Sequence, residues 1–198
     1  MVMNRAVIGV LALQGDYDKH RQMLELLGRR ALPVFNRADL HQCDGLIIPG
    51  GESTTLITLM KKHDLWQAVR EFGVHKPIYG TCAGCIVSAQ TVMPPQDSLG
   101  LIDVAVQRNA YGRQIDSFID DVTVQLNGKS ETVEGVFIRA PKIVAVGEDV
   151  TPLARHGGDV VLAKQGHVLV GTFHPELTDD LRIHRYFVDL VDRQTKTG

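Results

Sequence analysis

The 198-residue chain has few of the residues that mark specialised classes of protein. It contains three cysteines and one tryptophan, and its formal net charge is only −2. Three cysteines in a chain of this length do not make a disulfide framework, so we expect a reducing compartment, the cytosol. The absence of a basic excess makes nucleic acid a poor partner.

Long apolar runs are also absent. The first apolar run, residues 6–13, is too short to span a membrane and meets polar residues without a small-residue cleavage signal. It therefore predicts a strand and no membrane association. With 44% hydrophobic residues, the chain is long enough for a sizeable core. We expect a single domain over residues 1–198, with a frayed tail at residues 194–198.

What the first half of the chain does contain is an alternation of strand-like and helix-like segments. The predicted strands are short apolar runs at residues 7–12, 32–35, 45–48 and 77–79. The predicted helices cover residues 16–27, 53–60, 65–72 and 83–90, and Ser53 is the expected N-cap of the second. This alternation predicts an α/β fold with a mixed, mostly parallel sheet flanked by helices.

The second half changes character, because short β-type runs separated by turn signals replace the alternation. These runs lie at residues 103–106, 122–126, 136–138, 143–146, 160–163 and 168–173. Turn signals such as Asn127-Gly128 predict antiparallel additions to the sheet. A last helix is predicted over residues 179–191, with Thr178 as its N-cap.

Residues 80–84, Gly-Thr-Cys-Ala-Gly, have the pattern of a nucleophile elbow with the thiol of Cys82 at its centre. A predicted strand precedes the segment and a predicted helix follows it, which is the context this motif requires. The start of the helix favours the thiolate, and the next backbone N–H, that of Ala83, points where an oxyanion would form. The alternative is that Cys82 is a buried core residue, as free cysteines usually are.

A thiol nucleophile needs a base, and the base needs an orienting group. Of the eight histidines, His174 has the strongest context, because residues 172–176 read Thr-Phe-His-Pro-Glu at the end of a predicted strand. In an extended segment residues two apart point the same way, so Glu176 is expected to reach the His174 ring. Read alone, His174 is equally well an ordinary loop histidine; the elbow around Cys82 favours the catalytic interpretation.

Residues 49–53, Pro-Gly-Gly-Glu-Ser, follow another predicted strand. Two glycines, Gly50 and Gly51, let the backbone approach a ligand, and the N–H of Gly51 is our candidate for a second oxyanion donor beside Ala83. The alternative is an ordinary turn from strand to helix.

Together these segments resemble the class I (triad) glutamine amidotransferases. Further segments are similar to one subfamily, the glutaminase subunits of pyridoxal 5′-phosphate synthase (the PdxT/SNO family). They lie at residues 13–15, 49–55, 107–114, 135–141 and 173–178. The resemblance implies a three-layer, flavodoxin-like α/β fold.

The resemblance also implies hydrolysis of L-glutamine to L-glutamate and ammonia through a glutamyl thioester. Cys82 would attack the side-chain amide carbon. His174 would protonate the departing ammonia and then activate water, and Glu176 would orient His174. No metal ion is expected.

The glutamine-binding positions implied by the resemblance are Gly50, Gly51, Glu52, Arg108, Ile138 and Arg139. A guanidinium suits the α-carboxylate of glutamine and a carboxylate suits its α-ammonium, and Arg108 is our choice for the carboxylate. Alternatively, Glu52 and Arg139 pair with each other and shape the pocket. Arg113 is more readily a solvated surface charge.

The resemblance further implies a partner, the synthase subunit (the PdxS/SNZ family), in a large ring complex with glutaminases on the outside. Pyridoxal phosphate would be the product of that complex, so we expect no cofactor in this chain. It also implies a glutaminase that is weak until the partner docks. Gln14, at the end of the first strand, is our candidate link between the docking surface and the oxyanion loop.

Cys85 departs from this family, which usually has an aliphatic residue or Met at that position. With Cys82 it spells C-x-x-C, the pattern of a thiol-redox protein, and oxidation of the pair would switch a glutaminase off. A redox function leaves residues 49–52 and 174–176 unexplained. The sequence also leaves open the glutaminase of a different synthase, a γ-glutamyl hydrolase with an open cleft, and a non-catalytic regulatory protein.

Overall fold

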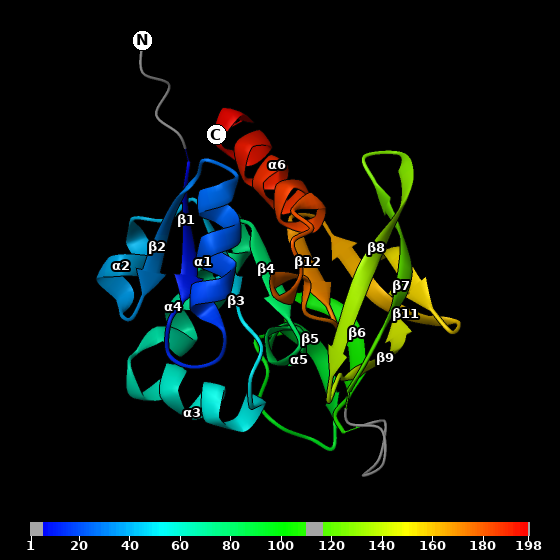
Figure 1. The fold of residues 1–198 in the computed structure, drawn as a ribbon. Helices are drawn as coiled ribbons and strands as arrows, with labels where there is room; N and C mark the ends of the chain where they lie inside the picture. Colours follow the sequence, from blue (N-terminus) through cyan, green and yellow to red (C-terminus); the bar gives the residue numbers. More distant parts are fainter. Residues whose placement is uncertain (1–5, 110–116, 198) are drawn as a thin grey trace.

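The computed structural model describes residues 6–109 and 117–197 (Figure 1). Its helices are α1 (Tyr17–Leu26), α2 (Arg37–His41), α3 (Ser53–Lys62), α4 (Leu65–His75), α5 (Ala83–Ser88) and α6 (Arg182–Thr197), with a 3-10 helix, η1, at Pro175–Leu177. Its strands are β1 (Val7–Leu11), β2 (Arg30–Val34), β3 (Gly45–Ile48), β4 (Ile78–Thr81), β5 (Ala89–Met93), β6 (Ile102–Gln107), β7 (Ser117–Leu126), β8 (Lys129–Ile138), β9 (Lys142–Val146), β10 (Thr151–His156), β11 (Asp159–Gln165) and β12 (Val168–Gly171).

The strands β2-β1-β3-β4-β12 form the parallel part of the sheet, in that order. Helices cover both of its faces, which is why β3 and β4 are buried along their whole length. Ile47 packs on the face with α1 and α6, and its neighbours Leu46 and Ile48 pack on the face with α2 to α5. The expected three-layer α/β architecture is therefore confirmed.

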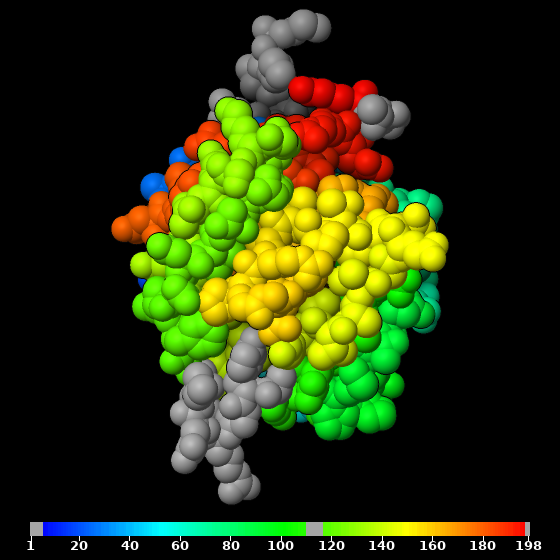
Figure 2. Space-filling view, turned by 90° about the vertical axis from the view of Figure 1, so that its right-hand side faces the viewer, coloured from blue at the N-terminus to red at the C-terminus, as the bar shows by residue number. Residues whose placement is uncertain are grey.

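The antiparallel part continues the sheet from β12 through β11, β10, β7 and β8, as expected for the second half of the chain. Figure 2 shows this face, coloured from lime green to orange. The strands β7 and β8 are joined at Asn127 and Gly128, which both have a positive φ, as a two-residue hairpin turn requires. The strands β5, β6 and β9 branch from β11 and enclose a third apolar core.

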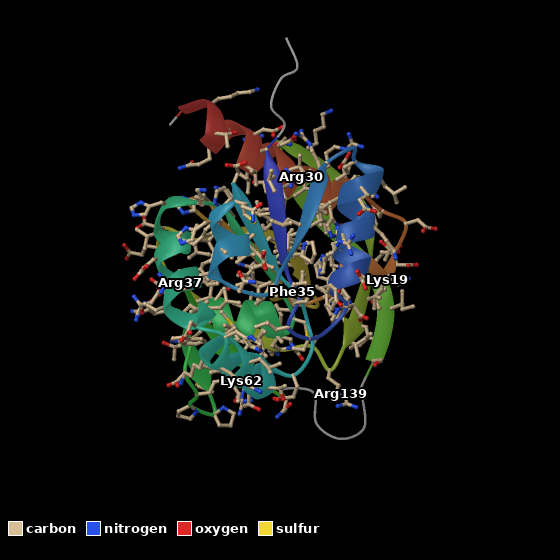
Figure 3. The ribbon with its side chains drawn as sticks, turned by 90° about the vertical axis from the view of Figure 1, so that its left-hand side faces the viewer. Lys19, Arg30, Phe35, Arg37, Lys62 and Arg139 are labelled. Carbon is tan, nitrogen blue, oxygen red and sulfur yellow. The ribbon has the colours of Figure 1, made fainter. Side chains whose placement is uncertain are left out.

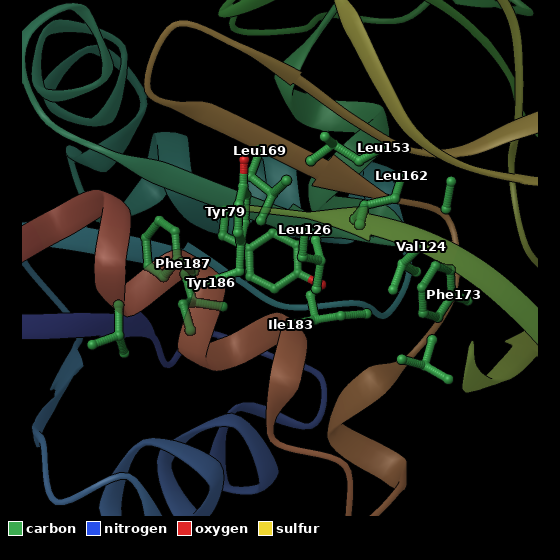
Figure 4. Close-up of a cluster of buried hydrophobic side chains, with 14 of the residues drawn as sticks. Tyr79, Val124, Leu126, Leu153, Leu162, Leu169, Phe173, Ile183, Tyr186 and Phe187 are labelled. Atoms are coloured by element: carbon green, nitrogen blue, oxygen red, sulfur yellow. The ribbon is translucent and has the colours of Figure 1, made fainter. Parts of the chain in front are cut away.

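Aromatic and aliphatic side chains fill the core between α6 and the sheet (Figure 4). The ring centroids of Tyr79 and Phe187 are 5.7 Å apart, and those of Phe137 and Phe173 are 5.5 Å apart. Phe173 and Tyr79 flank the two strand ends that carry the candidate site, so this packing fixes the site's backbone. Within the described residues, no helix is both long and apolar enough to cross a membrane.

Several boundaries differ from the sequence-based predictions. The helix predicted over residues 83–90 ends at Ser88, and the chain continues directly into β5. The elements α2, β5 and β10 were not predicted. β10 contains Pro152, which argued against a strand, and its pairing with β11 is irregular beside that residue.

The last helix was also predicted wrongly at both ends. It begins at Arg182, three residues later than expected, because the Thr178 hydroxyl binds the N–H of Asp180 and the Asp180 carboxylate binds the N–H of Arg182. At the other end α6 continues to Thr197, so residues 194–197 are part of the helix in the structure.

Candidate active site

Cys82 lies between β4 and α5 in a strained backbone conformation, with φ 48° and ψ −104°. A Cβ on Gly80 would lie 2.5 Å from the carbonyl oxygen of Gly84, and one on Gly84 would lie 2.0 Å from that of Ile48. Only glycine therefore fits at positions 80 and 84, two residues before and two residues after Cys82. Strain of this kind persists only where the surrounding structure holds it, and it gathers at functional sites.

The pairing of β4 with β12 brings the second part of the site to Cys82. Gly171 pairs with Thr81 in the parallel register, and the N–H of Cys82 donates to the carbonyl oxygen of Gly171 at 2.9 Å. His174 follows three residues after the end of β12. Its backbone N–H donates to Val136 of β8, which fixes the loop against the antiparallel strands.

The side chains of His174 and Glu176 are in direct contact. Nδ1 of His174 lies 2.7 Å from Oε1 of Glu176, and both residues are buried, at 6% and 3% exposure. The contact was expected from an extended backbone, but Glu176 in fact lies in η1, whose first residue is Pro175. The short helix places the carboxylate beneath the ring.

For both His174 and Glu176, burial shifts the pKa in one direction and the neighbouring groups shift it in the other. Burial disfavours the charged imidazole, but the Cys82 sulfur and the Glu176 carboxylate outweigh it and raise the pKa of His174 to about 10. Burial likewise disfavours the carboxylate, but His20 and His174 lower the pKa of Glu176 to about 2. The pair therefore favours an imidazolium beside a carboxylate.

The thiol of Cys82 lies at the entrance of this pair. Its Sγ is 3.9 Å from the carbonyl oxygen of Ile138, and Nε2 of His174 is buried with no hydrogen bond to any described residue. The Cys82 sulfur contributes to the raised pKa of His174, which places the two side chains within reach of each other.

A cavity of about 350 Å³ opens above the thiol. Most of the residues predicted to act on glutamine line it: Gly51, Glu52, Cys82, Arg108, Ile138, Arg139 and His174. Three lining residues that are not glycine have a positive φ, namely Cys82, Asn109 and Arg139. Figure 3 shows Arg139 at the lower end of the molecule, opposite Arg30. The volume suits a small polar ligand.

The loop after β3 packs directly on the side chains of Cys82 and His174. A Cβ on Gly50 would lie 2.6 Å from Cε1 of His174 and 3.3 Å from Cβ of Cys82. Gly51 has φ +126°, and a Cβ there would lie 2.4 Å from the Gln14 side chain. The Gln14 amide donates to the carbonyl oxygen of Gly50 and accepts from the N–H of Glu52, both at 3.2 Å. Gln14 therefore binds this loop at Gly50 and at Glu52, on either side of Gly51.

Glu52, and not Ser53, is the N-cap of α3. Its carboxylate accepts from the N–H groups and hydroxyls of Thr54 and Thr55. Burial opposes its charge, but these hydrogen bonds prevail and lower the pKa of Glu52 to about 2. Among the described residues, the partners of the Glu52 carboxylate are Thr54 and Thr55, and the alternative pairing with Arg139 is not formed.

Arg108 is positioned by two residues that the sequence did not single out for this purpose. Its Nη1 donates to Oε1 of Gln96 and lies 3.4 Å from the hydroxyl of Ser53, which itself donates to Gln96. Gln96 lies in a proline-containing loop between β5 and β6, and no motif marks it. The segment at residues 110–116, including Arg113, lies outside the described residues.

The C-x-x-C alternative has little structural support. Cys43, Cys82 and Cys85 are all free thiols. Cys85 is fully buried in the core beside β6, and burial raises its pKa well above the ordinary value. A thiol that resists ionisation is a poor attacking group in disulfide exchange.

A thiol on a strained elbow, an imidazole paired with a carboxylate and a polar cavity on an α/β sheet form the arrangement that a thiol-dependent amidase requires. The model of the SNO glutamine amidotransferase family matches residues 10–193. The chain belongs to this family, as its motifs predicted, and glutaminase chemistry is the activity that the family name describes.

Individual relatives and solved structures agree with this assignment. The chain is 50% identical over 186 residues to "Pyridoxal 5′-phosphate synthase subunit PdxT" of Brevibacillus brevis, covering 93% of this chain and 96% of the relative. It is 48% identical over 188 residues to the protein of the same name from Thermosipho africanus, covering 94% and 99%. A crystal structure of a glutamine amidotransferase matches with a TM-score of 0.87 and 43% identity, covering 93% and 98%.

More distant structures show the same fold alone. The structure of PurLQS from Thermotoga maritima matches with a TM-score of 0.70 at 16% identity, covering 98% of this chain and 98% of that one. The fold alone does not identify the family, and the assignment depends on the sequence matches.

Proposed function

We propose that this chain, acting as a single domain, is the glutaminase subunit of a pyridoxal 5′-phosphate synthase, with Cys82, His174 and Glu176 as its catalytic triad. The names of the PdxT relatives support the biological role. The observation that carries the triad is the 2.7 Å contact between His174 and Glu176 directly below a cavity that exposes the strained Cys82.

The first half of the reaction forms a thioester. The Cys82 thiolate attacks the side-chain amide carbon of glutamine, and the carbonyl electrons move onto oxygen. The N–H groups of Ala83 and Gly51 are the proposed donors to this oxyanion. When the tetrahedral intermediate collapses, the C–N bond breaks and the His174 imidazolium gives its proton to the nitrogen, which leaves as ammonia.

The second half regenerates the thiol. His174, now neutral, takes a proton from a water molecule as that water attacks the thioester carbon. The C–S bond breaks, glutamate leaves, and the proton returns the ring to the imidazolium beside the Cys82 thiolate. Glu176 stays ionised throughout, because its task is to hold Nδ1–H and stabilise the positive ring.

The charges around the cavity suit the two ends of free glutamine. Arg108 is the proposed partner of the α-carboxylate, and Gln96 and Ser53 hold its guanidinium in place. Glu52 stays ionised as the cap of α3 and faces the same cavity, so it suits the α-ammonium. Ile138 and Arg139 supply further walls of the cavity, and Gly50 shapes it by packing against His174 and Cys82.

The proposal extends to a synthase partner of the PdxS/SNZ family in a ring complex, to which the ammonia passes. Gln14 is the proposed activation link, because it binds the loop of Gly50 and Glu52 that carries the oxyanion donor Gly51. A partner that moves Gln14 changes the position of that donor. Gln14→Ala should then alter the stimulation of activity by the partner, and unchanged stimulation would remove Gln14 from this role.

Ammonia release from L-glutamine tests the proposal directly. The purified chain is assayed alone and with a purified pyridoxal 5′-phosphate synthase subunit, with Cys82→Ala as the blank. We expect activity that rises with the partner and disappears in the variant. Activity without any response to the partner would assign the chain to another amidotransferase, and no activity in either condition would contradict the proposed triad.

A further inference from the structure

A second buried imidazole lies behind the proposed triad. The ring of His20, on α1, has its Nε2 3.5 Å from Oε2 of Glu176, and both side chains have no solvent exposure. This is the carboxylate oxygen that His174 does not use, since His174 binds Oε1. Oε2 makes no hydrogen bond to a described residue, so the 3.5 Å approach of Nε2 is an electrostatic contact and not a formed hydrogen bond.

His20 is itself held by two further groups. Its Nε2 lies 3.2 Å from the hydroxyl of Thr81, the residue before the nucleophile, and its Nδ1 lies 2.9 Å from Nε2 of His184 on α6. The ring stands edge-on to Tyr79, with centroids 6.4 Å apart. The network thus joins α1, β4 and α6 to the carboxylate of the triad.

The carboxylate determines where the protons of this network lie. An ionised carboxylate only accepts hydrogen bonds, so Nε2 of His20 carries the hydrogen that faces Glu176. Burial lowers the pKa of His20 and keeps the ring neutral, although Glu176 acts in the other direction. Nδ1 is then an acceptor and must receive the Nε2–H of His184. This leaves Nδ1 of His184 as an acceptor, and it is buried without a partner among the described residues.

We propose that His20 is a positioning residue for the glutaminase reaction: its Nε2–H binds the Thr81 hydroxyl and, 3.5 Å from Oε2 of Glu176, attracts that oxygen so that Oε1 stays on Nδ1 of His174. The inference rests on the proposed triad. A residue that served only to fill the core would be better replaced by an apolar side chain, because a buried polar network costs free energy unless its hydrogen bonds are made.

Two substitutions at His20 separate the donor from the ring. His20→Phe keeps a flat ring of similar size but removes the N–H, whereas His20→Gln places an amide N–H near the position of Nε2. We expect His20→Phe to lower kcat for ammonia release by about 10- to 100-fold with KM for glutamine changed less than about threefold, as for lost orientation of a base. His20→Gln should recover a large part of kcat.

A double-mutant cycle distinguishes positioning from general damage to the fold. Glu176→Gln lowers kcat on its own, and adding His20→Phe to it should lower kcat by less than about twofold more if His20 acts only through Glu176. The matched control is His167→Phe, because His167 binds the carbonyl oxygen of Gly73 at the opposite ends of β4 and β12. It should leave kcat within about twofold of the wild type.

The outcomes separate the two proposals. If Glu176→Gln leaves kcat unchanged, the triad itself is wrong. If Glu176→Gln lowers kcat while His20→Phe folds and leaves it unchanged, only the role of His20 fails. Equal and additive losses in both backgrounds, or a His20→Gln variant as impaired as His20→Phe, would also reject positioning through Glu176.

Discussion

Gly50 lies directly against His174: a Cβ at Gly50 would come within 2.6 Å of Cε1 of the imidazole. The loop that carries the oxyanion donor and the proposed catalytic base are therefore one packed unit. Gly50→Ala must displace the ring, and a displacement of about 1 Å costs on the order of 10²-fold in rate. We expect kcat to fall by about that factor.

The control for this substitution is Gly128→Ala in the β7–β8 turn, where an added methyl group meets nothing within 4 Å. Alanine is strained at the positive φ of this position, so the substitution should lower the melting temperature slightly. It should leave kcat near the wild-type value. A Gly50→Ala enzyme with full activity would show that the imidazole does not depend on this contact.

Gln96 should determine the affinity for glutamine without touching the reacting atoms. Gln96→Leu removes the acceptor that holds Nη1 of Arg108. We expect KM for glutamine to rise about tenfold with kcat changed by less than about threefold, because binding to Arg108 is shared by ground and transition states. Gln67→Leu on α4, whose amide binds only Glu71 on the surface, is the matched control. An unchanged KM would assign the α-carboxylate to another cation.

Cys85 should be dispensable for the reaction. The thiol is buried away from the cavity lining, and its pKa is raised by burial, so it neither attacks nor carries charge. We expect Cys85→Ala to keep ammonia release within about threefold of the wild type. Labelling of the native protein with iodoacetamide should modify Cys82 faster than Cys85. Loss of activity in Cys85→Ala with the fold intact would reopen the redox interpretation.

The buried imidazole of His184 should make the fold sensitive to mild acid. Burial, and the neighbouring His20, lower the pKa of His184 from 6.5 to about 3. Below pH 6.5 the unfolded chain therefore binds a proton that the folded chain does not, and stability decreases as the pH falls. The contribution of one such group is at most about 1.4 kcal/mol per pH unit.

The range between pH 4.5 and 6.5 separates this effect from the contributions of Glu176 and His174, while His20, whose pKa burial also lowers, acts in the same direction as His184. Glu176, with a pKa lowered from 4.5 to about 2, loses its stabilising contribution only below that range, and His174, with a pKa raised from 6.5 to about 10, loses its contribution above it. We expect urea denaturation of His184→Gln to show a smaller dependence on pH across this range than the wild type. Equal slopes would mean that His184 is accessible to protons in the folded state.

The sequence predicted the candidate site best where its residues belong to a short local motif. Cys82 stands between glycines that the backbone geometry requires, and the three-residue spacing from β12 puts His174 at the same edge of the sheet. Local propensity was less reliable at helix ends, since Ser53 is the residue type preferred at an N-cap, but the side chain that accepts from the N–H groups of Thr54 and Thr55 is Glu52.

Contacts between distant segments could not be read from the pattern. His20 and His184 each fitted the apolar stripe of a helix, but nothing in either helix indicates that the two rings meet 2.9 Å apart. Gln96 lies in a loop without periodicity, so its contact with Arg108 emerges only when β5 and β6 pair. Short elements such as α2 and β10 are likewise determined by tertiary packing.

The position of β12 in the sheet determines when the candidate site can form while the chain is being translated. This strand lies between β4 and β11, although the chain reaches it only after all the other strands have been made. A ribosome-bound chain that has completed the elbow thus carries a thiol but no imidazole beside it, and the central gap in its sheet stays unfilled. If Cys82 and His174 act together as proposed, fragments that end before His174 should release no ammonia from glutamine.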